Sequence, residues 1–400
     1  MAKRILYITY DGLTDPLGQS QVLPYLLALS QKAIEFHILS FEKKENYESQ
    51  KDVITSTIRD SPIVWHPQVY HRHPPIISTM FDLWWMTYQA KALHRKHVFD
   101  GTWCRSYIPA LVGLALKRKS NVPFIFDMRG FWPDERVEGG SWPQTNPVFR
   151  TVYRYFKKKE KQLLAEADHV VVLTNKASQL LKTRSLHNNP IPKQISTIPC
   201  CVDMDLFDPA KVTVAQKNSV RNELGIAPSD AVLVYAGSLG TWYMMQEMLQ
   251  YFGELKKAKQ GWKFLFLTRD SPVSLLQDAR LTGLTESDVL IKSCSRREMP
   301  VYLSIANMAI SFIQPVFSKQ ASSPTKLAEY MSMGLVTACN SGVGDVDLLM
   351  RDAYSGVVDP ASFSTSNLDK LAKEGIRSIA ERNFSLERGL KTYSSVLESF

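Results

Sequence analysis

The sequence predicts an α/β protein with two doubly wound domains. Short apolar runs alternate with longer helical patterns, which is typical of parallel sheets covered by helices, and this series stops once and then starts again. The length of 400 residues also exceeds what one hydrophobic core usually organises. A polar, proline-containing stretch at 195–219 separates the two series. We therefore expect Rossmann-like domains at 1–205 and 206–383, and a final helix at 384–400 that packs back on the first domain.

Each domain has its own set of predicted strands. In the first domain they are Ile5–Tyr10, Phe36–Phe41, Phe124–Asp127 and Val170–Thr174. In the second domain they are Ala231–Ala236, Lys263–Thr268, Val289–Ile291, Met308–Ile313, Leu335–Cys339 and a last candidate near Gly356–Val358. Continuous apolar runs indicate strands that are buried on both faces of a parallel sheet. Ligands bind at the carboxyl ends of such strands, so the loops that follow them are the first places to search.

Positive charge and tryptophan are concentrated in the first half of the chain. The whole chain has a formal net charge of +9, and residues 1–205 carry 27 basic and 19 acidic side chains of the total. Six of the eight tryptophans lie there too, and Trp84-Trp85 are followed by Lys91, Arg95 and Lys96. Such a pattern suits peripheral contact with an anionic membrane, and burial of the tryptophans in a core is the alternative. The basic run at 150–161 is either a solvated helix face or a second lipid-attracting segment.

Several functional classes are not expected. The five cysteines lack metal-site spacing and fit a reducing cytoplasm. His71, His73, His94 and His97 form H-x-H and H-x-x-H pairs, but the carboxylates and cysteines nearby do not complete a convincing metal-binding set. We find no signal peptide, no apolar stretch near the roughly 18 residues that span a bilayer, no serine-nucleophile or Walker A motif, and no recognised nucleic-acid-binding module. We therefore expect a cytoplasmic protein without metal, cofactor or nucleic-acid partner.

The stretch SSPTKLAEYMSMG, at 322–334, is the strongest candidate binding site. Ser323 is a suitable N-cap and Pro324 suits the first helical turn, so free backbone N–H groups would point toward an anion. Lys326 adds a full charge, and Glu329 lies one turn further, within reach of hydroxyl groups attached to a bound phosphate. Phosphate plus hydroxyl groups describes a nucleotide or a nucleotide sugar. An ordinary capped helix with a Lys/Glu pair is the alternative.

Two glycine-containing loops also follow predicted strands. YAGSLG, at 235–240, would let the backbone at Gly237 approach a ligand, although a tight turn alone would explain its glycines. DGLTDPLGQS, at 11–20, is expected to be a flexible polar loop before a helix. Its residues Gly18, Gln19 and Ser20 are candidates for contact with phosphate or with a second ligand.

A third candidate ends another strand of the first domain. Asp127 and Arg129 place a carboxylate and a guanidinium at the same edge of the sheet as the first-domain loop. Perturbed charged groups at such an edge often do chemistry, and a buried structural ion pair is the alternative.

Taken in order, these segments resemble the retaining, family 4 type of glycosyltransferase, which has the GT-B fold. IPCCVDMDLFDP, at 198–209, resembles the family's segment I-P-N-G-V-D-x-x-x-F. YAGSLG resembles the glycine turn of the donor domain, SSPTKLAEYMSMGLVTA the helix that grips the donor, and FSLERGLKTYSSVLESF the terminal helix that crosses back. The resemblance runs nearly end to end. It implies two Rossmann-like domains that face a central cleft, with the acceptor in the N-terminal domain and the donor in the C-terminal one.

The resemblance also implies a reaction and a set of residues. A sugar would pass from a nucleotide-diphosphate sugar to an acceptor with its anomeric configuration kept and without a metal ion. Glu329 matches the second glutamate of the family's E-x7-E pattern, expected to hold the ribose. The implied donor-binding residues are Gly237, Ser238, Arg269, Ser323, Thr325, Lys326 and Glu329. The implied catalytic residues are Asp127, Arg129 and Lys326.

Departures from the family pattern leave two functions open. The first glutamate of E-x7-E would fall on Ala321, and Ser238, Thr241 and Trp242 stand where basic residues are common. The first function is an active transferase that uses a lipid-linked or membrane-proximal glycan acceptor in surface polysaccharide or glycolipid assembly. The second is a non-catalytic partner subunit of a glycosyltransferase complex.

Overall fold

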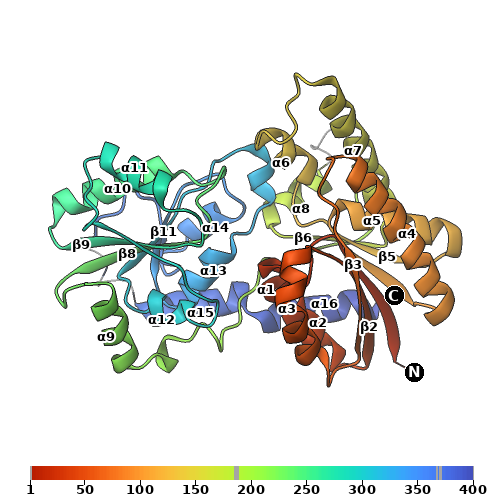
Figure 1. Cartoon of the computed structure of the whole chain (residues 1–400), viewed down its shortest axis with the longest axis horizontal. Helices are drawn as coiled ribbons and strands as arrows, with labels where there is room; N and C mark the ends of the chain where they lie inside the picture. The colour runs from red at the N-terminus through yellow and green to blue at the C-terminus, as the bar shows by residue number, and fades with distance from the viewer. Residues whose placement is uncertain (1, 184–188, 366–367, 369–371, 400) are drawn as a thin grey trace. The chain divides into compact units, whose positions relative to one another are not determined.

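The chain forms two α/β units, shown in Figure 1 by a computed structural model that describes residues 2–183, 189–365, 368 and 372–399. Unit 1 comprises Met1–Pro199 and Glu387–Phe400, and unit 2 comprises Cys200–Leu386. The first boundary therefore precedes the expected one at 205. The reason is local: the Cys200 backbone N–H donates to Ser323 Oγ, and Val202 forms a bridge with Ser385, so this segment already belongs to unit 2.

Unit 1 is built on a seven-stranded parallel sheet in the order β3-β2-β1-β4-β5-β6-β7. Its strands are β1 (Lys3–Thr9), β2 (Ile34–Glu42), β3 (Ile63–Val69), β4 (Gly101–Arg105), β5 (Phe124–Asp127), β6 (His169–Val172) and β7 (Ile195–Thr197). The strand order reverses at β1, with β2 on one side and β4 on the other. Such a reversal places a ligand-binding crevice outside the carboxyl ends of the strands.

Helices connect the strands of unit 1. They are α1 (Pro16–Gln21), α2 (Leu23–Ser30), α3 (Lys44–Ile58), α4 (Ile77–His97), α5 (Tyr107–Ser120), α6 (Trp132–Glu138), α7 (Pro147–Glu166) and α8 (Asn175–Lys182). Strands β1, β5 and β6 are buried along most of their length, as their continuous apolar runs predict, and β4 between them is buried too.

The last helix, α16 (Leu386–Glu398), belongs almost entirely to unit 1. Its Tyr393 ring lies 4.4 Å from Trp103 and 5.4 Å from Tyr25, measured between ring centroids. Lys3 Nζ donates to the Leu397 carbonyl at 2.7 Å. The end of the chain thus completes the core of the first unit. Residue 400, the last of the predicted helix, lies outside the described residues.

Unit 2 repeats the architecture with a six-stranded parallel sheet in the order β10-β9-β8-β11-β12-β13. The strands are β8 (Ala231–Ala236), β9 (Trp262–Leu267), β10 (Val289–Lys292), β11 (Met308–Ser311), β12 (Val336–Cys339) and β13 (Val357–Val358). The helices are α9 (Val214–Glu223), α10 (Met245–Ala258), α11 (Val273–Leu281), α12 (Met299–Leu303), α13 (Thr325–Ser332), α14 (Val346–Met350) and α15 (Lys373–Phe384), with 3₁₀ turns at Pro209–Lys211 and Phe317–Ala321. The predicted α/β fold with two doubly wound units is confirmed.

None of the described helices is long and apolar enough to cross a bilayer.

Candidate functional site

Helix α13 starts later than the sequence predicts. Pro324 is its N-cap, with Thr325 as the first helical residue. The expected cap by Ser323 is wrong, because the Ser323 hydroxyl accepts a hydrogen bond from the Cys200 backbone N–H at 3.1 Å. Ser323 therefore holds the segment that enters unit 2. The positive end of the helix lies at Thr325 and Lys326.

Lys326 occupies a buried aromatic site. Its side chain is only 6% exposed, and its Nζ donates to the Tyr235 hydroxyl at 2.8 Å. The same nitrogen lies 4.0 Å from the centre of the Tyr235 ring and 3.8 Å from that of Tyr243. Burial lowers the pKa of Lys326 well below its ordinary value. Within the described ranges, no carboxylate lies within 4 Å of this nitrogen. A buried lysine usually has such a partner, so the site is suited to a bound anion.

The glycine turn after β8 lies against this lysine. Gly237 has a φ of +131°, and a Cβ added there would lie 2.8 Å from Lys326 Nζ, so only glycine fits. The Tyr235 hydroxyl donates to the Ser238 carbonyl at 2.5 Å while it accepts from Lys326. Tyr235 thus ties the lysine to the turn. The structure brings Gly237, Ser238 and Lys326 together.

Arg269 follows β9 and is exposed. Its neighbour Asp270 accepts a hydrogen bond from the Leu239 backbone N–H at 2.6 Å, which joins this loop to the glycine turn. Arg269 therefore lies on a loop connected to the site, and its side chain faces solvent.

Glu329 is paired with an arginine that the sequence analysis did not single out. Arg296 NH1 lies 2.7 Å from Glu329 Oε1, and the Arg296 guanidinium lies 5.2 Å from the centre of the Phe207 ring. Burial raises the pKa of Glu329, and the Arg296 charge opposes that rise. The ion pair with Arg296, and not a pair with Lys326, orients the Glu329 side chain. The sequence feature that could have identified Arg296 is its position after a strand of unit 2, in the loop between β10 and α12.

Lys319 is a second buried cation in unit 2. It is 6% exposed, and its Nζ lies 3.8 Å from the centre of the Trp242 ring. Two residues later, Ala321 is 1% exposed at the position of the family's first glutamate. In the sequence, Trp242 stands out only because it lies where the family pattern commonly has a basic residue. In the structure Trp242 instead forms a cation–π contact with a lysine from elsewhere in the chain.

In unit 1, Asp127 is buried at the carboxyl end of β5. It is 1% exposed, and its Oδ2 lies 3.3 Å from Trp103 Nε1 and 3.5 Å from the Tyr393 hydroxyl. Its Oδ1 lies 3.9 Å from Arg129 NH1 and accepts no hydrogen bond from the described residues. Arg129 has a φ of +57°, a left-handed conformation that non-glycine residues adopt with strain. The two predicted residues are thus brought together as a loose, buried pair.

The acceptor loop expected at 11–20 is only partly a loop. Gly18, Gln19 and Ser20 lie within α1. A Cβ on Gly18 would lie 2.2 Å from the Gly12 carbonyl oxygen, Gln19 donates to the Thr14 carbonyl, and Ser20 donates to the Pro16 carbonyl. The expectation of a flexible polar segment is wrong for these three residues, because close packing and local hydrogen bonds make them helical.

The histidines of the H-x-H and H-x-x-H pairs do not form one cluster. His71 Nδ1 lies 2.6 Å from Asp82 Oδ1, whereas the centre of the His97 ring lies 4.2 Å from that of His37, with the two rings tilted by 50°. Across the described ranges, no three His, Cys, Asp or Glu side chains are grouped so as to hold a metal ion.

Comparison with known proteins supports the predicted family. Residues 21–206 match the model described as Glycosyltransferase Family 4. The D-inositol 3-phosphate glycosyltransferase of Segniliparus rotundus is 24% identical over 187 residues, which cover 45% of this chain and 38% of that protein. The chain therefore matches well under half the length of that relative.

Solved structures extend the likeness to both units. Sucrose-phosphate synthase from Thermosynechococcus elongatus is similar with a TM-score of 0.74, 15% identity, and coverage of 99% of this chain and 98% of that chain. The resemblance to family 4, GT-B glycosyltransferases is confirmed. Anabaena HepE, solved in complex with UDP and glucose, is similar to the GT-B fold of this chain with a TM-score of 0.70, 13% identity and coverage of 99% of both chains.

Proposed function

We propose that the chain is a retaining glycosyltransferase that moves a sugar from a nucleotide-diphosphate sugar to an acceptor. The observation that carries this proposal is Lys326: a buried cation beside a glycine turn and a helix N-terminus, with no carboxylate within ion-pair distance among the described residues. A diphosphate supplies the anion that this arrangement lacks. The UDP and glucose bound by the similar HepE structure support the choice of a nucleotide sugar.

Each donor group has a proposed partner in unit 2. Lys326, Thr325 and the backbone at Gly237 and Ser238 would hold the diphosphate, with Arg269 at the edge. Glu329 would accept hydrogen bonds from the ribose hydroxyls, since Arg296 orients its carboxyl group and opposes the rise in its pKa. Ser323 would stabilise the site indirectly, because its hydroxyl accepts a hydrogen bond from the Cys200 backbone N–H.

Charge stabilisation at the leaving group would make a metal ion unnecessary. When the bond between the anomeric carbon and the diphosphate breaks, negative charge develops on the diphosphate oxygen. Lys326 and the positive end of α13 stabilise charge at that place. The acceptor oxygen then forms the new bond to the anomeric carbon, and its proton leaves with the diphosphate.

Unit 1 would hold the acceptor near Asp127 and Arg129. Asp127 Oδ1 accepts no hydrogen bond from the described residues, so a hydroxyl group of the sugar could donate to it. The acceptor we propose is a lipid-linked or membrane-proximal glycan in surface polysaccharide or glycolipid assembly. The protein would then work in the cytoplasm, in peripheral contact with an anionic membrane and with no nucleic-acid partner.

One observation favours a second function. Ala321 is fully buried where a glutamate would contact the donor sugar, so that contact is absent or comes from another residue. A non-catalytic partner subunit would keep nucleotide binding and lose transfer.

A donor panel separates the two functions. We would measure thermal stabilisation of the full chain by UDP, GDP, ADP, CMP and their sugars, with and without divalent metal, and then release of the free nucleotide with time. One selective, metal-independent stabilisation with release of nucleoside diphosphate is expected. Stabilisation without release under any acceptor condition would favour the partner subunit, and no stabilisation by any nucleotide would refute the donor site.

A further inference from the structure

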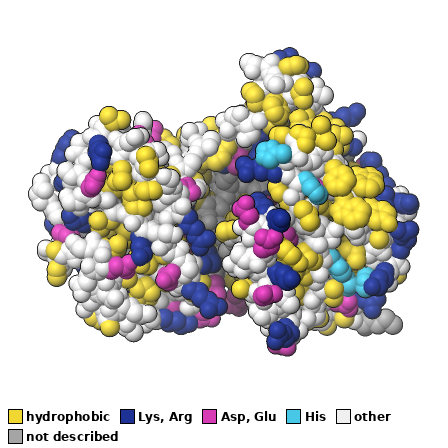
Figure 2. Space-filling model, in the orientation of Figure 1, with side chains coloured by type: hydrophobic (Ala, Val, Ile, Leu, Met, Phe, Trp, Pro, Cys, Tyr) yellow, Lys and Arg dark blue, Asp and Glu magenta, His cyan; other side chains and the backbone are white. Residues whose placement is uncertain are grey.

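Helix α4 exposes a contiguous aromatic face in unit 1. Met80, Phe81, Trp84 and Tyr88 have exposed fractions of 66%, 47%, 60% and 51%. Figure 2 shows this face as a hydrophobic patch over α4. The rings support one another, since the Trp84 and Tyr88 rings stack with their centres 6.3 Å apart. Apolar patches of this kind on a folded protein mark interaction sites.

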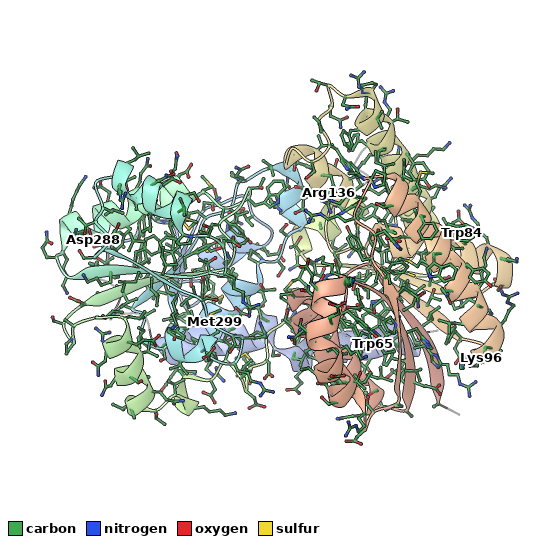
Figure 3. All side chains as sticks on the ribbon, viewed as in Figure 1. Trp65, Trp84, Lys96, Arg136, Asp288 and Met299 are labelled. Atoms are coloured by element: carbon green, nitrogen blue, oxygen red, sulfur yellow. The ribbon has the colours of Figure 1, made fainter. Side chains whose placement is uncertain are left out.

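The helices around this face hold the chain's excess charge. Helices α4, α5 and α7 together carry twelve basic and three acidic residues, a net charge of +9 that equals that of the whole chain. Figure 3 labels Trp84 and Lys96, which lie along the same helix. The run at 150–161 forms most of α7, where Lys157 pairs with Asp134 and Glu160 while Lys158 is exposed. An apolar patch bordered by positive charge suits an anionic surface.

A groove between α4, α5 and α7 adjoins the aromatic face. Its volume is about 280 Å³, near the lower end of small-molecule pockets. Leu83 of α4 and Leu111, Leu114 and Ala115 of α5 give it apolar walls.

Two cations of the groove come from different helices. Arg118 of α5 is 52% exposed and is held by Glu166, with its Nε 3.0 Å from Glu166 Oε2. Lys159 of α7 donates to Gln162 Oε1 at 3.1 Å, and no carboxylate of the described residues lies within 4 Å of its Nζ. The groove therefore joins apolar walls to a net positive rim.

We propose that this groove binds one anionic phospholipid from a bilayer, with the phosphate near Lys159 and Arg118 and part of an acyl chain against Leu111 and Leu114. The aromatic face of α4 would lie in the membrane interface beside it. A second copy of this chain fits the face poorly, because a symmetric contact would bring the same basic helices together. The proposal rests on the membrane part of the proposed function, but its test involves no sugar.

The groove is separate from the candidate acceptor site. Helix α5 starts just after the carboxyl end of β4, and the helical rise of 1.5 Å per residue places Leu111 and Arg118 about 6 and 17 Å along it. The lipid would thus anchor the protein rather than react.

The first experiment uses a lipid that dissolves as monomers. We would titrate the full chain with dioctanoyl phosphatidylglycerol below its micelle threshold and count bound molecules by native mass spectrometry. One bound lipid is expected, with at least tenfold weaker binding of dioctanoyl phosphatidylcholine and no binding of inorganic phosphate. Equal affinity for both lipids, or phosphate binding at the same groove, would overturn the proposal.

Matched variants locate the lipid. Lys159→Glu should lower the affinity at least tenfold, whereas Lys158→Glu, one residue away on the same helix and outside the groove, should change it less than threefold. Ala115→Trp should fill the groove and remove binding, with Ala258→Trp as an exposed control in unit 2. Equal effects of the two lysine reversals would mean general surface attraction and would refute a groove site.

Vesicles test the aromatic face. Binding to vesicles with 30% phosphatidylglycerol should fall at least fivefold in Phe81→Ser/Trp84→Ser, whose side chains are exposed. If instead the native chain is a dimer that does not bind vesicles and the variant is a monomer, the face is an interface between copies of the chain and the proposal fails.

Discussion

Replacing Lys326 by methionine should make the protein more stable and weaken its binding of the donor. Methionine keeps much of the length of the side chain but carries no charge, and the Tyr235 hydroxyl keeps its bond to the Ser238 carbonyl. Removing a buried charge in favour of an apolar side chain is often neutral or stabilising, by up to about 4 kcal/mol. The two ring contacts of Lys326 would be lost, so we expect a gain of about 1–2 kcal/mol.

The sign of the pH dependence gives a second test of the same substitution. The pKa of Lys326 is lower in the folded than in the unfolded chain, so the unfolded chain holds more protons below the ordinary value of 10.5. The stability contributed by this group therefore rises with pH toward 10.5. Lys326→Met should gain more stability at pH 7 than at pH 10.

Donor binding should change in the opposite direction. A charge-assisted hydrogen bond to phosphate contributes about 1.5–3 kcal/mol, so affinity for the best nucleoside diphosphate should fall roughly 10- to 150-fold. Urea denaturation at both pH values gives the stabilities, and calorimetric titration gives the affinity. If unit 2 unfolds by itself, its melting temperature should rise by about 2–8 °C, given its 187 residues between Cys200 and Leu386.

An exposed lysine provides the control. Lys257 lies on α10 with its side chain 75% exposed, so Lys257→Met should change stability by less than about 0.5 kcal/mol and leave affinity intact. A Lys326→Met protein that is less stable than the native one, or that binds the diphosphate as well, would refute the account of the buried cation.

Three further outcomes are expected in unit 2. Gly237→Ala should lower stability by about 1–3 kcal/mol and also lower diphosphate affinity, because the added Cβ meets Lys326 Nζ at a positive φ. Gly240→Ala is the control: nothing lies within 4 Å of its Cβ, so the same denaturation and titration should show unchanged stability and affinity. Glu329→Gln should weaken binding of nucleosides that carry both ribose hydroxyls far more than binding of 2′,3′-dideoxy analogues. In the native chain, the raised folded-state pKa of Glu329 makes the free energy of unfolding fall as the pH rises above 4.5, and the substitution should remove this pH dependence. Ser323→Ala should cost about 1–2 kcal/mol in urea denaturation by orphaning the Cys200 N–H, with little change in affinity.

Much of the sheet was predictable because burial on both faces leaves a continuous apolar run. The predicted strands at 124–127 and 231–236 match β5 and β8 residue for residue. Strand β4 was missed although all five of its residues are buried, because it begins with a glycine and ends in Arg105, which hide the run. Strand β3 was missed because it lies at the edge of the sheet, where Pro67 and polar residues are tolerated.

The candidate site was predictable where its residues share one helix. Spacing alone put Lys326 and Glu329 one turn apart near a helix start. It gave no sign that Tyr235 and Tyr243 enclose the lysine or that Arg296 pairs with the glutamate, since these contacts join residues 33 to 91 positions apart. Propensity favoured Ser323 as a cap, but a tertiary hydrogen bond took its hydroxyl.

The place of α16 affects the order in which the protein folds during synthesis. Unit 2 is one continuous stretch, so it has all its residues once Leu386 has been made. Unit 1 needs Tyr393, which packs on Trp103 and lies 266 residues after Asp127 in the chain. At about 5–20 residues per second, the ribosome adds that helix roughly 15 to 50 seconds after β5. The second unit therefore has all its residues before the first, and the Trp103 surface stays uncovered until α16 has been made.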